Sequence, residues 1–313
     1  MQCVLAFLVT SVFLTVLVSL ALVGNVLQIL LLPVNVFSPA VAYHANSYIA
    51  GFLWTLCDLY FRLNGCSVEL VYRDHKDGAI VKDGQGPKAQ NQTSAIVISN
   101  HRFFGDFFLI HKWAIKSKML PYCKYFAKDS LKWVPGFGWG MWLIGFIMVK
   151  REWMRDAQRI TRTFNSYISM PHLPVWIVSY VEGSRFTPRK CAKSGEYARE
   201  RGLAPLKHLL LPRTRGFTAA VNAFRLSKHV QTVYDLLLIY SHPTKGFGAT
   251  PTVWDFFTGK LNKYTYTVHV TRYDIKEIPE DPEEAGKWLY NVYEKNDLEL
   301  DALALSLNSK KQE

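Results

Sequence analysis

Two ionisable side chains five residues apart, His101 and Asp106, interrupt an apolar part of the sequence. The run AIVI (95–98) precedes them, and the run FFLI (107–110) follows. A carboxylate at this spacing can fold back onto the imidazole, which fixes the tautomer and leaves the other ring nitrogen free as a base. The spacing equally fits a structural histidine with an aspartate that caps a helix. General base catalysis is therefore a hypothesis that needs support from other features.

A second polar insertion, EGSR (182–185), follows the apolar run PVWIVSYV (174–181). Glycine at position 183 allows backbone N–H groups to approach an anion closely. The guanidinium of Arg185 can bind a phosphate or a carboxylate through two hydrogen bonds. A turn with a surface ion pair explains the same residues without any ligand.

A third basic position ends the segment 130–151, SLKWVPGFGWGMWLIGFIMVKR. Residues 133–149 carry no charge, but one proline and four glycines interrupt them, which disfavours a straight membrane-spanning helix. The segment suits an apolar surface or channel followed by a strand, LIGFIMV (143–149), that ends at Lys150 and Arg151. A buried core segment is the alternative interpretation.

The elements that must position these residues alternate between strands and helices. Strands are predicted at 95–99, 174–181, 233–241 and 264–273, and helices at 107–120, 151–170 and 279–297. This alternation predicts an α/β domain with a mixed sheet flanked by helices. Ligands usually bind at the carboxyl ends of strands in such sheets, which is where His101, Lys150 and Arg185 would lie.

The N-terminal part of the chain differs sharply from the rest. Residues 3–32 hold no charge, and a membrane-spanning helix needs about 20 such residues. A cleaved signal peptide fits poorly, because there is no basic n-region and the apolar run is too long. We therefore expect a permanent N-terminal membrane helix. Residues 47–63 form a second apolar pattern that fits a second span, a helix in the bilayer interface or a core helix. A second span or an interfacial helix would give a two-helix membrane motif.

The overall charge favours anionic partners. The 313 residues include 37 Lys and Arg against 25 Asp and Glu, a formal net charge of +12. The five cysteines form no C-x-x-C pair, which favours reduced thiols over a disulfide framework. The sequence contains no phosphate-binding P-loop motif and no zinc-type cysteine cluster. With a membrane helix present, nucleic-acid binding is a poor second interpretation of the basic charge.

Four segments together resemble the glycerolipid acyltransferase family, and specifically the eukaryotic 1-acylglycerol-3-phosphate acyltransferases. NHRFFGD (100–106) is similar to the Asn-His-x4-Asp block, and VEGSRFTP (181–188) to the Glu-Gly-Thr/Ser-Arg block. KDSLKWVPGFGW (128–139) with GFIMVKR (145–151) resembles the block that ends in arginine, and LKHLLLPRTRGF (206–217) with VYDLLLIY (233–240) resembles later segments. Val181 stands where the family often has proline.

The resemblance implies a reaction and a set of site residues. His101 would remove the proton of an acceptor hydroxyl that attacks the thioester of an acyl-CoA, with Asp106 orienting the ring. Lys128, Arg151 and Arg185 would bind the phosphate of a lysophospholipid, and Glu182 would hold a glycerol hydroxyl or the EGSR turn. The complete set of substrate-binding positions it implies is Asn100, Lys128, Lys150, Arg151, Glu182, Gly183, Ser184 and Arg185. Neither a metal nor a resident cofactor is expected, since acyl-CoA is a co-substrate.

The most favoured function is acyl transfer to lysophosphatidic acid, which gives phosphatidic acid. Transfer to another lysophospholipid such as lysophosphatidylinositol is one alternative, and a non-catalytic membrane protein that binds anionic lipid is another. The expected partners are acyl-CoA, the lysophospholipid and the bilayer, with no nucleic acid. We expect a membrane anchor at 1–63, a polar connection at 64–94, the acyltransferase domain at 95–305 and a polar tail at 306–313.

Two signals address cellular location. Lys310 and Lys311 resemble the dilysine retrieval signal of endoplasmic reticulum membrane proteins, although a solvated basic tail explains them equally. Every lysine and arginine follows the N-terminal helix, which favours a cytosolic catalytic domain. The sequon at Asn91 points the other way, because N-glycosylation would place that loop in the lumen. We expect an endoplasmic reticulum membrane protein whose catalytic domain faces the cytosol.

Overall fold

A computed structural model of the chain describes residues 2–76, 78, 80–81, 92–150, 152–227 and 229–309. At its centre is a mixed sheet in the order β2-β1-β9-β7-β3-β6-β4-β5, with β8 paired to β7. The strands are β1 (Val68–Arg73), β2 (Ile80–Val81), β3 (Ala95–Ser99), β4 (Cys123–Lys128), β5 (Ile147–Val149), β6 (Trp176–Tyr180), β7 (Thr232–His242), β8 (Gly246–Phe247) and β9 (Thr265–Asp274). Strands β7, β3, β6, β4 and β5 run parallel, whereas β9 runs antiparallel to β7. The predicted α/β fold with a mixed sheet is confirmed.

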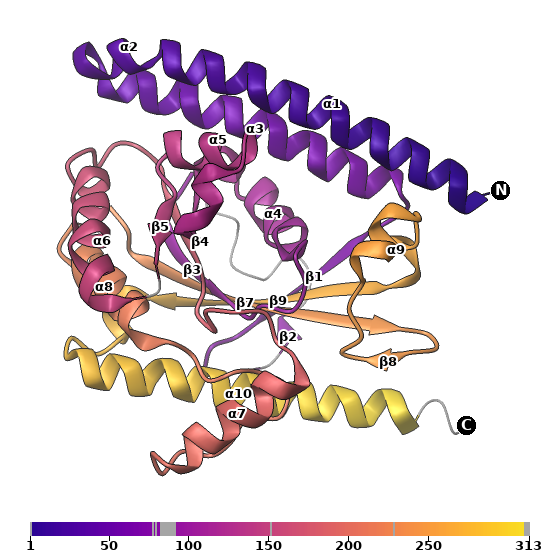
Figure 1. The fold of residues 1–313 in the computed structure, drawn as a ribbon. Coiled ribbons are helices and arrows are strands. Elements are labelled where there is room, and N and C mark those ends of the chain that lie inside the picture. The colour runs from indigo at the N-terminus through magenta and orange to yellow at the C-terminus, as the bar shows by residue number, and fades with distance from the viewer. Residues whose placement is uncertain are drawn as a thin grey trace.

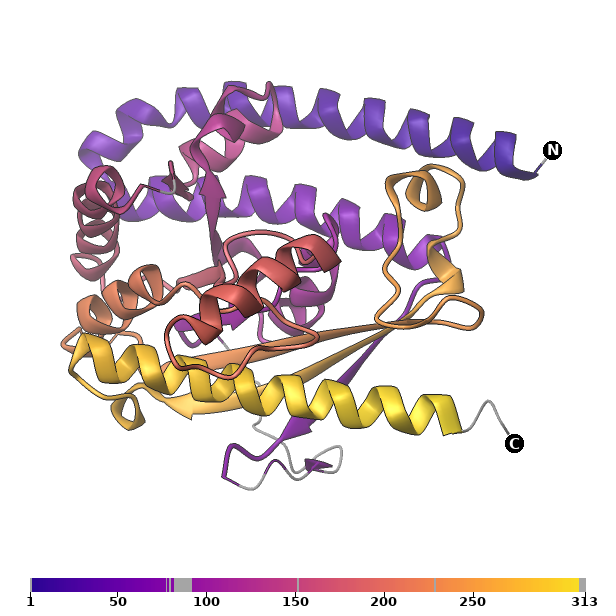
Figure 2. The same cartoon turned by 60° about the horizontal axis from the view of Figure 1, so that its bottom comes forward.

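Helices cover both faces of this sheet (Figure 1). One face carries α1 (Gln2–Leu30), α3 (Pro39–Leu63), α4 (Asp106–Lys116) and α5 (Phe137–Leu143). The other face carries α6 (Trp153–Ile168), α8 (Thr214–Arg225) and α10 (Pro282–Ser309), with α7 (Pro188–Arg199) beside α10 (Figure 2). The described residues also form short helices, which are α2 (Leu32–Phe37), α9 (Val253–Phe257), η1 (Leu120–Tyr122), η2 (Asp129–Trp133), η3 (Leu261–Lys263) and η4 (Ile275–Glu277).

Strand β3 shows why the sequence folds into three layers. Ala95 and Val97 point into the core beneath α4, whereas Ile96 and Ile98 point into the core beneath α6, α8 and α10. Successive side chains of a strand alternate between faces, so a strand buried on both faces must be apolar throughout. The predicted bounds of this strand, 95–99, agree with the structure.

The segment 143–149 differs from its prediction as a continuous strand. Its first residue, Leu143, ends helix α5, and only Ile147–Val149 pair in the sheet as β5. Gly145 adopts a φ of +84°, a left-handed conformation that ends helices and that glycine adopts without steric cost. The glycines that exclude a spanning helix here therefore permit a short helix followed by a short strand.

Strand β1 lies within the segment predicted as a polar connection. Residues 68–73 pair with β9 along the whole of β1, so they are part of the sheet. The sequence VELVYR alternates polar and apolar residues only briefly, which made this strand easy to overlook.

The N-terminal helices α1 and α3 run antiparallel and lie side by side (Figures 1 and 2). Thr10 and Tyr60 share a hydrogen bond of 2.7 Å, and Gly24 lies against Ile49 further along the pair. Within the described residues, α1 alone is long and apolar enough to cross a membrane. Helix α3 instead buries a face that includes Trp54 and Phe61, which favours the core-helix interpretation of residues 47–63.

Candidate active site

The predicted site residues that the structure describes follow or end neighbouring strands on one side of the sheet. Strands β3, β6, β4 and β5 are parallel neighbours, so their carboxyl ends share one edge. His101 follows β3, the EGSR turn follows β6, Lys128 ends β4 and Lys150 follows β5. Residues that lie up to 84 positions apart in the sequence therefore reach one side of the molecule.

His101 and Asp106 form a hydrogen-bonded pair at this edge. The Nδ1 atom of His101 lies 2.7 Å from Oδ2 of Asp106, the first residue of α4. An ionised carboxylate only accepts hydrogen bonds, so Nδ1–H is the donor, and in the neutral imidazole this tautomer leaves Nε2 without a proton. The side chain of His101 is 21% exposed, whereas that of Asp106 is fully buried. The arrangement can present a base to a molecule bound at the edge.

Three further donors hold the Asp106 carboxylate in place. The backbone N–H groups of Arg102 and Phe103 lie 2.7 and 3.0 Å from its oxygens, and the Tyr240 hydroxyl from β7 donates to Oδ1. Together with His101 they give this buried carboxylate four hydrogen bonds. Such a set fixes the position of the carboxylate and, through it, the orientation of the imidazole.

The imidazole of His101 is also packed from the side. The ring of Tyr180, the last residue of β6, stacks on it with centroids 4.2 Å apart and an interplanar angle of 18°. Burial raises the pKa of Tyr180 well above its usual value, and Asp106 acts in the same direction. The phenol is therefore neutral at physiological pH and restricts the rotation of the histidine ring.

The EGSR turn is joined directly to the His101 loop. The backbone N–H of Phe186 donates to the carbonyl of His101 at 2.7 Å. Arg102 lies between the loops, with its guanidinium 4.5 Å from the ring of Phe186 and hydrogen bonds to the carbonyls of His208 and Gly248. The two blocks therefore form a single structural unit.

Glu182 lies beneath this unit and does not reach the surface. It is 3% exposed, and neither carboxylate oxygen makes a hydrogen bond of standard geometry to any described residue. Burial raises the pKa of Glu182 well above its usual value, while the nearby Arg102 acts in the opposite direction. This position suits the expected role of holding the turn better than contact with a glycerol hydroxyl.

Gly183 allows a close approach that no other residue type permits. Its φ is +68°, and a Cβ atom here would lie 2.6 Å from Cδ of Arg213. The backbone N–H of Arg213 donates to the carbonyl of Val181 at 2.7 Å, which fixes Arg213 over the turn. Sequence reasoning included segment 206–217 through the resemblance but did not select Arg213 as a site residue.

The structure describes three of the four basic side chains among the predicted substrate-binding residues. Lys128, Lys150 and Arg185 are exposed, and none of the three side chains makes an ion pair within the described part of the chain. Lys128 pairs in register with Val149, so Lys128 and Lys150 lie on adjacent strand ends. Arg151 lies outside the described residues. Free cations at this edge can attract a phosphate.

Two other predicted substrate-binding residues are Asn100 and Ser184. Asn100 is buried, and its side-chain amide donates to the carbonyl of Leu238 at 3.0 Å and accepts from the N–H of Leu238 at 2.8 Å. The amide thereby ties the loop to β7 and keeps little capacity for a substrate. Ser184 is half-buried in the turn.

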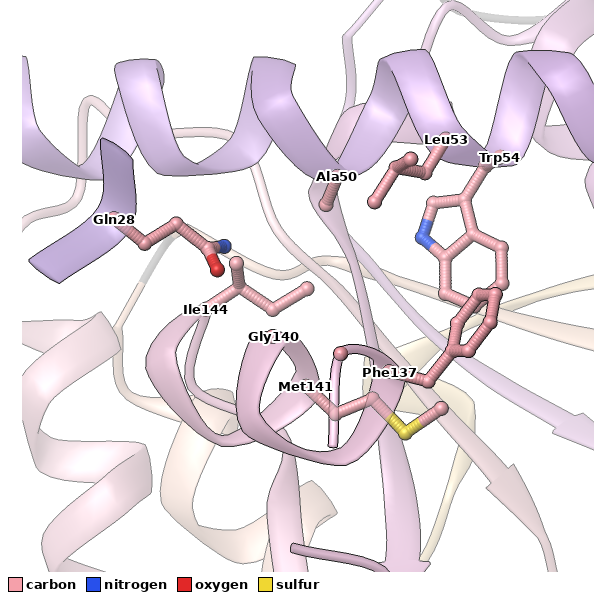
Figure 3. A pocket seen from close by; sticks show the side chains of 9 residues that line it. Gln28, Ala50, Leu53, Trp54, Phe137, Gly140, Met141 and Ile144 are labelled. Atoms are coloured by element: carbon pink, nitrogen blue, oxygen red, sulfur yellow. The ribbon is translucent and has the colours of Figure 1, made fainter. Parts of the chain in front are cut away.

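A small cavity of about 30 Å³ lies between α1, α3 and α5 (Figure 3). Its wall includes Trp54, Phe137, Met141 and Ile144, and the amide of Gln28 lies at one end. The space holds about one water molecule. A row of aromatic rings joins this cavity to the site, because the rings of Trp54, His111, Tyr125, Tyr180 and His101 lie next to one another in that order.

A larger cavity of about 710 Å³ opens between α3 and α4. Asp58, Arg62, Lys112 and Lys118 lie on its wall, and it contains none of the predicted site residues. Over the described ranges, no group of three or more His, Cys, Asp or Glu side chains is placed to hold a metal ion. The chemistry that the site supports most directly is proton removal by His101.

Comparison with known proteins gives consistent matches. A family model described as Acyltransferase matches residues 82–236, and one described as Acyltransferase C-terminus matches residues 255–303. The human protein 1-acyl-sn-glycerol-3-phosphate acyltransferase gamma is 30% identical over 298 residues, which cover 94% of this chain and 74% of that protein. The delta protein of Rattus norvegicus is 33% identical over 67% of this chain and 54% of its own length. The Arabidopsis thaliana protein 1-acyl-sn-glycerol-3-phosphate acyltransferase 3 is 26% identical over 90% of this chain and 70% of its own length.

Proposed function

This chain belongs to the glycerolipid acyltransferase family, and from that premise we propose that it transfers an acyl chain from acyl-CoA to the free hydroxyl of lysophosphatidic acid. The product would be phosphatidic acid. The observation that carries the proposal is the His101–Asp106 pair, in which Nδ1 of a partly exposed imidazole is hydrogen-bonded to the buried carboxylate.

The proposed reaction begins with the acceptor hydroxyl next to Nε2 of His101. As the oxygen attacks the thioester carbonyl, its proton passes to Nε2, and Asp106 stabilises the imidazolium that forms. The tetrahedral intermediate then collapses, the carbon–sulfur bond breaks, and the imidazolium returns a proton to the CoA thiolate. A well-placed general base contributes roughly 10²–10⁴ in rate. Holding both substrates in reacting geometry supplies much of the rest.

We assign the phosphate of the lysophosphatidic acid headgroup to the basic side chains at the carboxyl ends of the strands. Arg185, Lys128 and Lys150 are exposed there, and Arg151 belongs to the same proposed set although it lies outside the described residues. Arg213 joins the set because its side chain lies over Gly183. Charge-assisted hydrogen bonds of this kind are stronger than neutral ones.

The acyl chain of the donor is assigned to the apolar side of His101. The aromatic row from Tyr180 to Trp54 and the cavity beside Phe137 and Met141 give an apolar path away from the base. A chain of many methylene groups requires more room than this cavity has, so the neighbouring helices α1 and α5 would have to separate when the donor binds.

The proposal includes membrane association at the endoplasmic reticulum with the catalytic edge in the cytosol, where acyl-CoA is supplied. The support is the long apolar helix α1, together with the charge distribution along the chain. The resemblance to a dilysine signal concerns Lys310 and Lys311, which lie outside the described residues.

An acyl transfer assay with a panel of acceptors tests the proposal. Purified full-length protein is incubated with acyl-CoA and, separately, with lysophosphatidic acid, lysophosphatidylinositol and other lysophospholipids. We expect the highest kcat/KM with lysophosphatidic acid. Faster transfer to another headgroup would reassign the acceptor, and no transfer to any acceptor would favour the non-catalytic lipid-binding alternative.

A further inference from the structure

Helix α9 presents two apolar side chains that remain more than half exposed on the described part of the chain. Val253 is 56% exposed and Trp254 is 63% exposed. The helix is only five residues long, and a capping box between Thr252 and Asp255 fixes its start. Helix α9 is called the tip below. Two consecutive exposed apolar side chains on it favour contact with an apolar partner.

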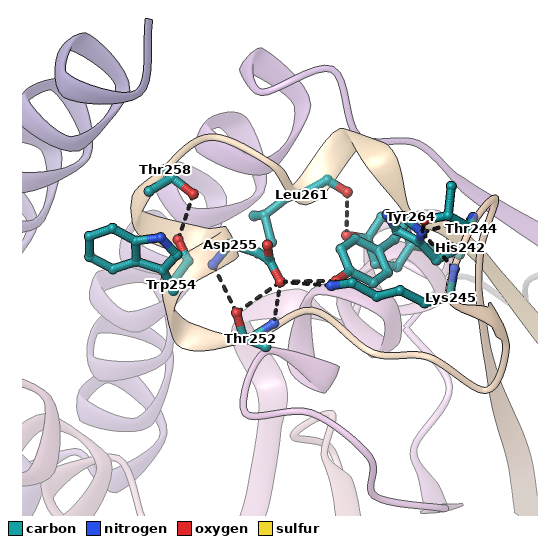
Figure 4. A network of polar contacts seen from close by, with 10 residues as sticks. His242, Thr244, Lys245, Thr252, Trp254, Asp255, Thr258, Leu261 and Tyr264 are labelled. Carbon is teal, nitrogen blue, oxygen red and sulfur yellow. Dashed lines mark hydrogen bonds and ion pairs between the residues drawn. The ribbon is translucent and has the colours of Figure 1, made fainter. Parts of the chain in front are cut away.

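A network of polar contacts holds this tip rigidly on the body (Figure 4). Asp255 accepts from the N–H and hydroxyl of Thr252 at 2.9 and 2.8 Å and from the Tyr264 hydroxyl at 2.9 Å. Lys245 donates to Tyr264 at 2.6 Å and lies 3.7 Å from Asp255. The exposed residues are therefore presented in one orientation, because their base is fixed by several hydrogen bonds.

The tip is continuous with the apolar surface of α1. The ring of Phe7 packs on Trp254 and Phe257, with centroids 6.3 and 5.6 Å apart, and Ala6 lies against Gly259. Figures 1 and 2 both show α9 beside the N-terminal end of α1. On α1 itself, Val4, Leu5, Leu8 and Val9 are exposed next to this contact.

The tip also touches the catalytic loop. Phe104 lies between His101 and Asp106 in the sequence, and its ring packs edge-on against Phe256 of α9 at 5.6 Å. Phe256 is buried and packs in addition on Tyr60 of α3. One side of α9 therefore faces outward beside α1, and its other side supports the loop that carries the proposed base.

We propose that α9 is a second membrane-contact element. Its residues Val253 and Trp254 enter the same bilayer interface as the apolar face of α1. The contact between Phe256 and Phe104 holds the His101 loop at that lipid surface. The occupant is a bilayer because the patch continues the surface of a helix of membrane-span length. Tryptophan is enriched where a bilayer meets water. Lys263 at the end of η3, six residues after α9 in the sequence, is exposed and fits the headgroups of an anionic bilayer. The proposal rests on the proposed function, since it gives the lipid substrate its route to the base.

The first test measures insertion without any reference to activity. Full-length protein in vesicles of phosphatidylcholine and phosphatidic acid is compared with vesicles that contain brominated phosphatidylcholine, which quenches nearby tryptophan fluorescence. We expect the quenched signal of wild type to fall in Trp254→Phe and to stay unchanged in Trp288→Phe, whose indole packs on Phe217 and Tyr273 on the far side of the sheet. Equal quenching of the two variants would overturn the proposal.

The second test separates membrane contact from catalysis. Trp254→Glu should lower the transfer rate to a long-chain acceptor embedded in vesicles by at least about tenfold, because a charge at this position opposes insertion. Its rate with a short-chain, monomeric acceptor in solution should match wild type. Equal losses with both acceptors would show a structural defect instead, and no loss with either would refute membrane contact. If wild type transfers to neither acceptor, the proposed function fails, and the quenching result still decides the role of α9.

Discussion

At the scale of single residues, the proposed catalysis needs Asp106 as much as His101. The carboxylate fixes the histidine tautomer, so we expect Asp106→Asn to keep the shape of the loop but to lose at least about 100-fold in kcat. An asparagine can present its NH2 group to Nδ1 and leave Nε2 protonated. Steady-state kinetics at saturating acyl-CoA measure the loss.

Tyr240→Phe is the matched control for this prediction. It removes one donor to Asp106 and leaves the His101 hydrogen bond and both backbone donors in place. We expect a smaller loss than for Asp106→Asn, since the tautomer of His101 is still enforced. Equal losses in the two variants would contradict the tautomer argument.

Arg185 provides a residue-scale prediction for the acceptor. Arg185→Ala should raise the KM for a phosphate-bearing lysophospholipid by about 10–100-fold, the equivalent of a charge-assisted contact of about 1.5–3 kcal/mol. The KM for acyl-CoA should change less. Arg189→Ala is the control, because Arg189 is equally exposed in the first turn of α7. An unchanged KM for the lysolipid would place the phosphate elsewhere.

The sequence predicts local contacts at the site far better than distant ones. The spacing of five residues between His101 and Asp106 allows the hydrogen bond that the structure contains, although the same spacing also fitted a helix cap. Tyr240 donates to Asp106 from 134 residues away, and no spacing rule could have selected it. Tyr180 and Arg213 were missed for the same reason, since only the sheet order places them beside the histidine and the glycine turn.

At the scale of elements, α4 contains a histidine that takes no part in the proposed proton transfer. His111 is buried, neither ring nitrogen has a partner among the described residues, and burial lowers its pKa to about 3. An unfolded chain binds a proton at this histidine below about pH 6.5, whereas the folded chain does not. Stability should therefore fall as the pH falls from about 6.5 toward 3, by at most about 1.4 kcal/mol per pH unit from this group.

His111→Leu should remove that part of the pH dependence. Leucine fills similar space without burying an unpaired polar group, so the variant should be at least as stable as wild type near neutral pH. The measurement is the thermal unfolding midpoint of the detergent-solubilised protein at about pH 7.5 and about pH 5. The control is His172→Leu at an exposed position, which should retain the wild-type difference. A wild-type difference in His111→Leu would contradict the prediction.

Elements with a clear hydrophobic period were predictable, and those that depend on tertiary contacts were not. Helix α6 lies within the predicted range 151–170, because its apolar stripe repeats at helical spacing. Strand β1 was missed, since its six residues, VELVYR, alternate between apolar and polar only over the first three. Helix α9 has five residues, too few for any period, and its position is fixed by the Asp255 network.

At the scale of the whole molecule, the rest of the protein contacts α1 along most of the length of this helix. Phe7 touches α9, Thr10 bonds to Tyr60, Ala21 lies against Gly136, and Asn25 lies against Gly140. One side of α1 is therefore packed on protein, while the other side is exposed and apolar. A bilayer that covers the exposed side would bring lipid close to the proposed catalytic residues.

The topology prediction follows from this arrangement and from the charge distribution. We expect the sequon at Asn91 to carry no glycan, because the catalytic domain is proposed to face the cytosol. Asn91 lies outside the described residues, so the test is biochemical: glycosidase treatment should leave the mobility of the full-length protein unchanged. A shift that disappears in Asn91→Gln would place the loop before His101 in the lumen and contradict the proposed supply of acyl-CoA.

The most direct test of the central claim is the rate of phosphatidic acid formation by wild type and by His101→Ala, at saturating acyl-CoA and lysophosphatidic acid. His101 is partly exposed, so its replacement by alanine should leave the fold intact, which circular dichroism and the unfolding midpoint verify. We predict that the folded variant loses roughly 10²–10⁴ in turnover, the contribution of a general base. A folded His101→Ala protein that turns over at the wild-type rate would contradict the assignment of His101 as the base.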